Sequence, residues 1–142
     1  TMPVRLLTQS VLRWPEPAVV LQAVKAWAVA QASQHPGLER VGVYGSYGRG
    51  DAGVGSDLDL VLIDRRATGT ASERFRRWPF ETLPLSCDAL ILTPKEWDQL
   101  MLTGRPIAAQ DPATAAMAKA LERDCRWLWI RDENVADTKH HD

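Results

Sequence analysis

The chain has 142 residues, of which 45% are hydrophobic and 25% charged, and its formal net charge is −1 at pH 7. This length is typical of one globular domain with its own core, and the near-neutral charge argues against a protein that binds nucleic acid through an overall basic surface. Cys87 and Cys125 are too few for a disulfide framework, so we expect reduced thiols and a cytoplasmic protein. No apolar run approaches the roughly 18 residues of a membrane span, and we expect no secretion signal.

The first half predicts one long helix followed by short strands. Residues 1–14 are ambiguous and are expected as an extended arm. Pro15 and Pro17 suit the first turn of a helix, and apolar residues then recur at helical spacing until His35-Pro36-Gly37 ends it. The apolar runs expected as strands over the whole chain are residues 41–44, 58–63 and 85–92.

The second half predicts three more helices. A short one is expected around residues 72–78, within a polar and arginine-rich stretch. Thr93-Pro94-Lys95-Glu96 fits a capping box that opens a second helix, which should end near Gly104. Asp111-Pro112 opens a third. The apolar side chains expected on its inner face are Met117, Leu121 and Leu128.

The alternation of helices and strands indicates an α/β (α+β) protein. We expect a single domain over residues 1–142, with a core at about 17–130 and a disordered polar tail at 132–142. The basic side chains between the second and third strands favour a solvated loop over an RNA or partner surface; they are Arg65, Arg66, Arg74, Arg76 and Arg77.

Two carboxylates stand at the head of the apolar run 58–63. Asp57 and Asp59 are two residues apart, so in a strand they point to the same face, about 7 Å from each other. Carboxylates at this spacing repel one another unless a cation lies between them. Mg²⁺ is the natural candidate, because it is usually bound by one or two carboxylates together with substrate phosphates. Alone, such a pair is usually a solvated cap at the start of a strand.

A glycine-rich turn precedes these carboxylates. Gly45 follows a predicted strand and lets the chain turn sharply, and Ser46 opens a short helix whose free N–H groups suit phosphate oxygens. Arg49 adds a guanidinium, whose planar shape and permanent charge suit phosphate oxygens. A Gly-Ser pair alone is usually only a turn. Here it follows one predicted strand, and Asp-x-Asp stands at the head of the next; this combination predicts a metal–nucleotide site. The predicted nucleotide-binding residues are Gly45, Ser46, Arg49, Gly50 and Ser56.

Gly45-Ser46, ten intervening residues and Asp57-Leu58-Asp59 resemble the motif of the minimal nucleotidyltransferases, in the DNA polymerase beta-like nucleotidyltransferase superfamily. The resemblance covers roughly residues 17–104. It implies a small mixed sheet flanked by helices, and a third carboxylate on a later strand, for which Asp88 is the candidate. Members often read Gly-Ser-Arg-Ala-Arg-Gly, whereas Tyr47 and Gly48 stand here in place of the first arginine and the alanine.

The resemblance also implies a chemistry. Two Mg²⁺ ions, or Mn²⁺, would be held by Asp57, Asp59 and Asp88, and a nucleoside monophosphate would pass from a nucleoside triphosphate, ATP in the leading interpretation, to a hydroxyl acceptor. Asp88 would also take the acceptor's proton.

The same resemblance suggests a partner. Relatives that modify antibiotics or RNA carry an extra helical domain, for which we expect no room in this chain. Minimal nucleotidyltransferases commonly pair with a small helical HEPN-type toxin and transfer AMP to one of its tyrosines, which implies an antitoxin. Two alternatives stay open: a non-catalytic antitoxin or scaffold that acts by binding, and an enzyme for a small molecule such as an aminoglycoside. A homo-oligomer is also compatible with the sequence.

Overall fold

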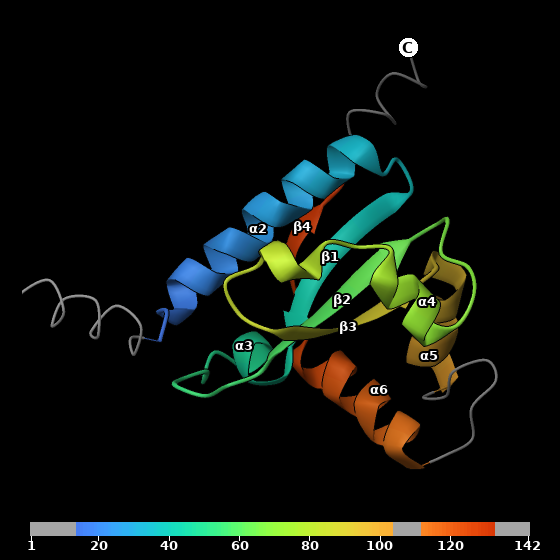
Figure 1. The fold of residues 1–142 in the computed structure, drawn as a ribbon. Helices are drawn as coiled ribbons and strands as arrows, with labels where there is room; N and C mark the ends of the chain where they lie inside the picture. The colour runs from blue at the N-terminus through green and yellow to red at the C-terminus, as the bar shows by residue number, and fades with distance from the viewer. Residues whose placement is uncertain (1–13, 104–111, 133–142) are drawn as a thin grey trace, which may run out of the picture.

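The computed structural model describes residues 14–103 and 112–132. The elements in chain order are α2 (Pro17–Gln34), β1 (Leu38–Tyr44), α3 (Gly45–Arg49), β2 (Leu58–Asp64), α4 (Ala71–Arg76), the 3-10 helix η1 (Phe80–Thr82), β3 (Cys87–Leu92), α5 (Pro94–Thr103), α6 (Pro112–Asp124) and β4 (Arg126–Ile130) (Figure 1). Among the helices in this part of the chain, none is long and apolar enough to cross a membrane.

The strands form one mixed sheet in the order β3-β2-β1-β4. The inner strand β1 is antiparallel to both of its neighbours, β2 and β4, whereas the other inner strand, β2, runs parallel to β3. The C-terminal end of β1 therefore lies at the same end of the sheet as the starts of β2 and β3. This end brings together the glycine-rich turn, which follows β1, and the carboxylates at the heads of the other two strands.

Helices cover both faces of the sheet, and β2 supplies side chains to both because its side chains alternate. Leu60 points into a cluster with Val24 and Trp27 of α2. Val61 points into a second cluster with Leu100 of α5 and Leu121 of α6. Figure 1 shows the sheet lying between α2 on one side and α5 and α6 on the other. The mixed sheet flanked by helices confirms the predicted fold class.

Local signals placed most of the elements correctly. The capping box at the start of α5 is present: the Thr93 N–H donates to Glu96 Oε1 at 2.8 Å, and the Glu96 N–H donates to Thr93 Oγ1 at 3.1 Å. Each of the three predicted strands overlaps an observed one: β2 starts at Leu58 as predicted, whereas β1 starts earlier and β3 later than predicted. Three predictions fall outside the described residues. They are the N-terminal arm, the end of a helix near Gly104 and the polar tail after residue 132.

The prediction for the C-terminal part was wrong in two respects. The helix ends at Asp124, and Leu128 lies in β4, which pairs antiparallel with β1. Met117 is exposed, whereas Leu121 is buried as predicted, together with Ala118. The five-residue strand follows the helix almost directly, so local periodicity extends the helix; only pairing with the distant β1 distinguishes the two.

The arginine-rich stretch is not a uniformly solvated loop. The Arg74 side chain is only 13% exposed and bonds to Glu96 at 2.7 Å, while it also donates to the Ile91 carbonyl. This ion pair holds the pKa of the Glu96 carboxyl below its ordinary value. Arg74 therefore ties α4 to β3 and to the start of α5, where the sequence predicted a solvent-facing side chain.

Candidate active site

The glycine-rich turn touches the carboxylate of Asp59. Gly45 has φ +65°, a conformation that favours glycine, and a Cβ added there would lie 2.8 Å from Asp59 Oδ2. The preceding residue, Tyr44, is the direct partner of Asp59 in the antiparallel pairing of β1 and β2. The absent side chain at Gly45 thus leaves room for a carboxylate directly beneath the turn.

A second carboxylate lies beside Asp59 on the neighbouring strand. Asp59 and Asp88 are partners in the parallel register of β2 and β3, and adjacent strands are about 4.8 Å apart. Asp57 directly precedes β2. Asp59 is half-buried, whereas Asp57 and Asp88 are exposed. The structure therefore gathers all three predicted carboxylates at the same end of the sheet.

The electrostatics of this group suit a cation. Burial raises the pKa of the Asp59 carboxyl, and the charges of Asp88 and Asp57 raise it further. Among the described residues, no cation contributes to this shift of the Asp59 pKa. Oxygen donors of like charge fit a divalent cation, for which Asp57, Asp59 and Asp88 are the candidate ligands.

The side chains do not form a preassembled metal centre. Within residues 14–103 and 112–132, no three His, Cys, Asp or Glu side chains are arranged to coordinate one ion. Asp88 Oδ1 instead accepts a hydrogen bond from the Ala89 N–H at 3.0 Å. A cation held through this oxygen would have to compete with that backbone donor.

Tyr44 joins the carboxylates across the sheet, and the sequence analysis did not identify it. Burial raises the pKa of its hydroxyl to about 12, with further contributions from Asp59 and Asp88. Tyr44 therefore stays protonated and remains a possible hydrogen-bond donor beside two acceptors. Nothing in the local sequence distinguishes it from the last residue of a strand, because its place beside Asp59 depends on the register of β1 and β2.

The predicted nucleotide-binding residues have different surroundings. Ser46 is half-buried in the first turn of α3, and Gly50 ends that helix at φ +87°. The Ser56 hydroxyl accepts the Gly53 N–H at 2.9 Å and so closes the loop before Asp57. Of these residues, Gly45 is the one that the structure brings into contact with a candidate carboxylate.

Arg49 is held by a network that the sequence did not reveal. Its Nη1 lies 3.1 Å from Asp124 Oδ2, and its Nε lies 3.2 Å from Asp51 Oδ2. Arg123 also bonds to Asp124, with Nε 2.8 Å from Oδ1 and Nη2 3.0 Å from Oδ2. The Asp124 side chain is only 2% exposed. This buried carboxylate fixes the predicted phosphate-binding guanidinium to the end of α6.

The two departures from the family pattern have structural consequences. Tyr47 is 1% exposed and belongs to the core, so this position does not present a side chain to a phosphate. A Cβ on Gly48 would collide with the carbonyl oxygen of Asp124. Tyr47 therefore anchors the short helix α3 from below, while Gly48 lets the end of α6 approach it closely.

Comparisons with known proteins agree with this geometry. The family model of the nucleotidyltransferase domain matches residues 28–108. A crystal structure of a candidate nucleotidyltransferase from Sulfolobus solfataricus matches with a TM-score of 0.54 and 19% sequence identity, over 85% of this chain and 94% of that chain. At this identity, the structural match shows a shared fold. No curated protein matches the sequence. Because the family model covers more than half of the chain, the chain belongs to the nucleotidyltransferase domain family.

Proposed function

We propose that this nucleotidyltransferase moves AMP from ATP onto a hydroxyl group of a partner protein. The contact between the Gly45 turn and Asp59, beside Asp88 in the parallel register, is the observation that carries the proposal. It puts a turn suited to phosphate next to a group of carboxylates suited to a divalent cation. For the acceptor we propose a tyrosine of a small helical HEPN-type toxin, on the basis of the motif resemblance, so that the chain acts as an antitoxin.

Each group at this end of the sheet has a separate part in the proposed reaction. Ser46 and the N–H groups of the turn bind triphosphate oxygens. Divalent cations, two Mg²⁺ or Mn²⁺ when bound by Asp57, Asp59 and Asp88, supply positive charge that offsets the triphosphate and acidifies the acceptor hydroxyl. The acceptor oxygen forms a bond to the α-phosphorus, the bond to the bridging oxygen breaks, and its electron pair leaves with pyrophosphate. Asp88 accepts the hydroxyl proton.

Transfer to a HEPN-type protein is the direct test of the acceptor. The chain, Mg²⁺ and ATP labelled in the α-phosphate are mixed with that protein and, as a control, with its tyrosine-to-phenylalanine variant. We expect label and a mass gain of one AMP on the protein with the tyrosine only. Stable association without an adduct would instead support a binding-only antitoxin, and label on an added aminoglycoside would support a small-molecule enzyme.

The role of Arg49 can be separated from its structural contacts. Arg49→Ala should weaken Mg-ATP binding by about 1.5–3 kcal/mol, because a charge-assisted phosphate contact is lost. Arg123→Ala is a matched control, since it removes the other guanidinium from the same Asp124 carboxylate. Calorimetry should show weaker binding for the Arg49 variant alone. Equal losses in both variants would mean that Arg49 acts only through Asp124.

A further inference from the structure

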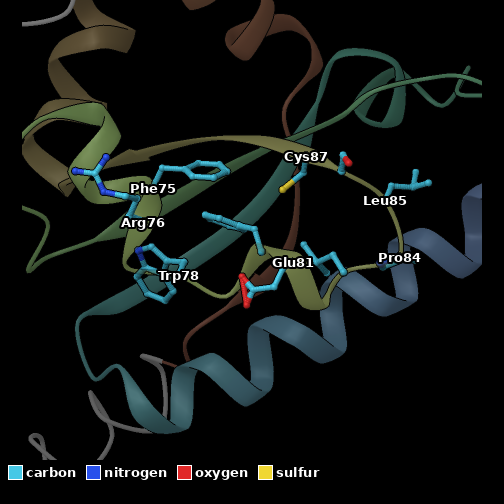
Figure 2. A pocket seen from close by; sticks show the side chains of 10 residues that line it. Phe75, Arg76, Trp78, Glu81, Pro84, Leu85 and Cys87 are labelled. Carbon is cyan, nitrogen blue, oxygen red and sulfur yellow. The ribbon is translucent and has the colours of Figure 1, made fainter.

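A hollow of about 660 Å³ opens beside the start of β3. Its wall combines apolar and polar side chains from α4, η1 and the segment before β3. Aromatic and aliphatic residues such as Phe75, Trp78 and Leu83 alternate with Arg76, Glu81 and Ser86. Figure 2 shows the Phe75 ring and the Cys87 sulfur pointing toward one another, while the Arg76 guanidinium points away. Burial raises the pKa of the Cys87 thiol to about 11, so this sulfur is a neutral, apolar part of the wall at physiological pH.

A groove of about 350 Å³ continues from the hollow to the candidate active site. It shares Phe75 and Arg76 with the hollow, and it also contacts Ser72, Asp88 and Ala89. The groove therefore runs between α4 and β3. Its wall includes a candidate catalytic carboxylate, and a ligand that fills both spaces would lie along this strand.

The strand beside the groove is an edge strand of the described sheet, because β3 is the first in the strand order and, within residues 14–103 and 112–132, pairs with β2 alone. Two bonds show which backbone groups face away from β2: the Ala89 N–H binds a side chain, and the Ile91 carbonyl binds Arg74. Backbone groups of alternate residues point to the same side of a strand, so the carbonyl of Cys87 shares this orientation. Arg74 occupies the far end of the edge, whereas Cys87 and Ala89 lie where the groove and the hollow are.

The side chain that occupies the Ala89 N–H is the carboxylate of Asp88 itself, at 3.0 Å. This bond covers a backbone donor at a sheet edge, and it also engages one oxygen of the Asp88 carboxylate within its own strand. A carbonyl oxygen supplied by an added strand could replace Asp88 on this N–H. The displaced carboxylate would then be free to join Asp59 and Asp57. Binding of an added strand at the edge of β3 would therefore be coupled to the gathering of Asp57, Asp59 and Asp88, through the one hydrogen bond between the Ala89 N–H and Asp88.

We propose that the edge of β3 at Cys87 and Ala89 binds an extended segment of a polypeptide acceptor, whose hydroxyl side chain enters the candidate active site beside Asp88. The proposal rests on the proposed function and adds the place and the conformation of the acceptor. Side chains of an added strand alternate between the faces of the sheet. Asp88 shares a face with Asp59, whereas Cys87 lies on the face of the hollow. A tyrosine directed at Asp88 therefore puts its two neighbours in the chain into the hollow, against its aromatic and aliphatic side chains.

The transfer step is that of the proposed function, with a nucleoside triphosphate as the co-reactant. The tyrosine oxygen bonds to the α-phosphorus, pyrophosphate leaves with the electron pair of the broken bond, and the phenolic proton passes to Asp88. The edge supplies orientation: backbone hydrogen bonds fix the acceptor segment in register, so the hydroxyl is held at one distance from the carboxylates. Free tyrosine lacks these bonds and should be a poor acceptor.

The proposal is tested with a library of short extended peptides that carry a fixed tyrosine and varied neighbours, with N-acetyltyrosine amide as the small-molecule comparison. Ala89→Pro removes the N–H that faces the groove, which an edge strand tolerates, and Ala89→Val is the matched control that keeps it. Ser72→Trp, on exposed α4, fills the groove without altering the sheet. Labelling from ATP is measured beside calorimetric Mg-ATP binding and thermal unfolding of each variant.

We expect wild-type kcat/KM for the peptides to exceed that for the amide by about tenfold or more, with a preference for apolar neighbours of the tyrosine. Ala89→Pro and Ser72→Trp should lose this advantage while they retain Mg-ATP binding, and Ala89→Val should keep it. Equal labelling of peptides and amide, wild-type labelling by Ala89→Pro, or Mg-ATP binding without any peptide labelling would overturn edge docking. Absence of Mg-ATP binding by the wild type would overturn the proposed function, and edge docking with it.

Discussion

Asp59→Asn should abolish nucleotide transfer and at the same time make the fold more stable. Asp59 is the carboxylate that both the Gly45 turn and Asp88 approach, so its charge is central to the proposed site. The three carboxylates of the proposed site would act together, so removal of this charge should lower the rate of transfer about a thousandfold or more. Asparagine keeps the shape of the side chain, and its neutrality relieves the repulsion from Asp57 and Asp88.

The gain in stability follows from the direction of the Asp59 pKa. The folded state raises this pKa through burial and like charge, so the fold binds the proton more tightly than the unfolded chain does. The stabilisation from the protonated carboxyl is fully present below the unfolded pKa and is lost as pH rises through the folded pKa. At neutral pH the ionised carboxylate therefore destabilises the fold, and Asp59→Asn removes that cost.

The predicted gain in stability is tested by thermal or urea unfolding at neutral and at acid pH, and the predicted loss of activity by the transfer assay. The variant should be more stable than the wild type at neutral pH, and the difference should shrink as the wild-type carboxyl is protonated. Asp57→Asn is the control, since Asp57 is exposed and its replacement should change stability by only about 0.5 kcal/mol or less. A less stable Asp59→Asn protein that still transfers AMP would mean that Asp59 has a structural role instead.

Local sequence signals were sufficient for much of the fold. The capping box at Thr93 and Glu96 placed α5, and the apolar run after Asp57 placed β2. β4 was missed because a five-residue segment next to a helix is recognisable only through its pairing with β1. The Arg49–Asp124 bond joins residues 75 positions apart and has no local signal at all.

The candidate site was predictable in its parts but not in its present arrangement. The spacing of Gly45 and Asp59 predicted one metal–nucleotide site. In the structure the turn and this carboxylate meet, because the end of β1 and the start of its antiparallel neighbour β2 lie together. The position of Asp88 beside Asp59 needs the parallel register of β2 and β3. Its orientation could not be predicted, since it depends on which backbone N–H groups the sheet leaves at its edge.

Gly48→Ala should destabilise the protein by about 3 kcal/mol, the upper part of the usual range for inserting a methyl group where there is no space. A Cβ at Gly48 would collide with the carbonyl oxygen of Asp124 and lie 3.1 Å from that of Val43. Both obstacles are backbone atoms, which cannot move aside as a flexible side chain can. The end of α6 would have to shift away from α3, and this shift would break the bond between Arg49 and the buried Asp124.

Urea unfolding measures this effect, and Gly53→Ala provides the control. A Cβ at Gly53 meets nothing within 4 Å, and its φ is not positive, so its replacement should change stability by only about 0.5 kcal/mol or less. If Gly48→Ala were as stable as Gly53→Ala, α3 and α6 would not be in rigid contact. If Gly48→Ala instead folds with reduced stability, Mg-ATP binding should weaken in parallel, because the shift of α6 releases the Arg49 guanidinium from the position that Asp124 gives it.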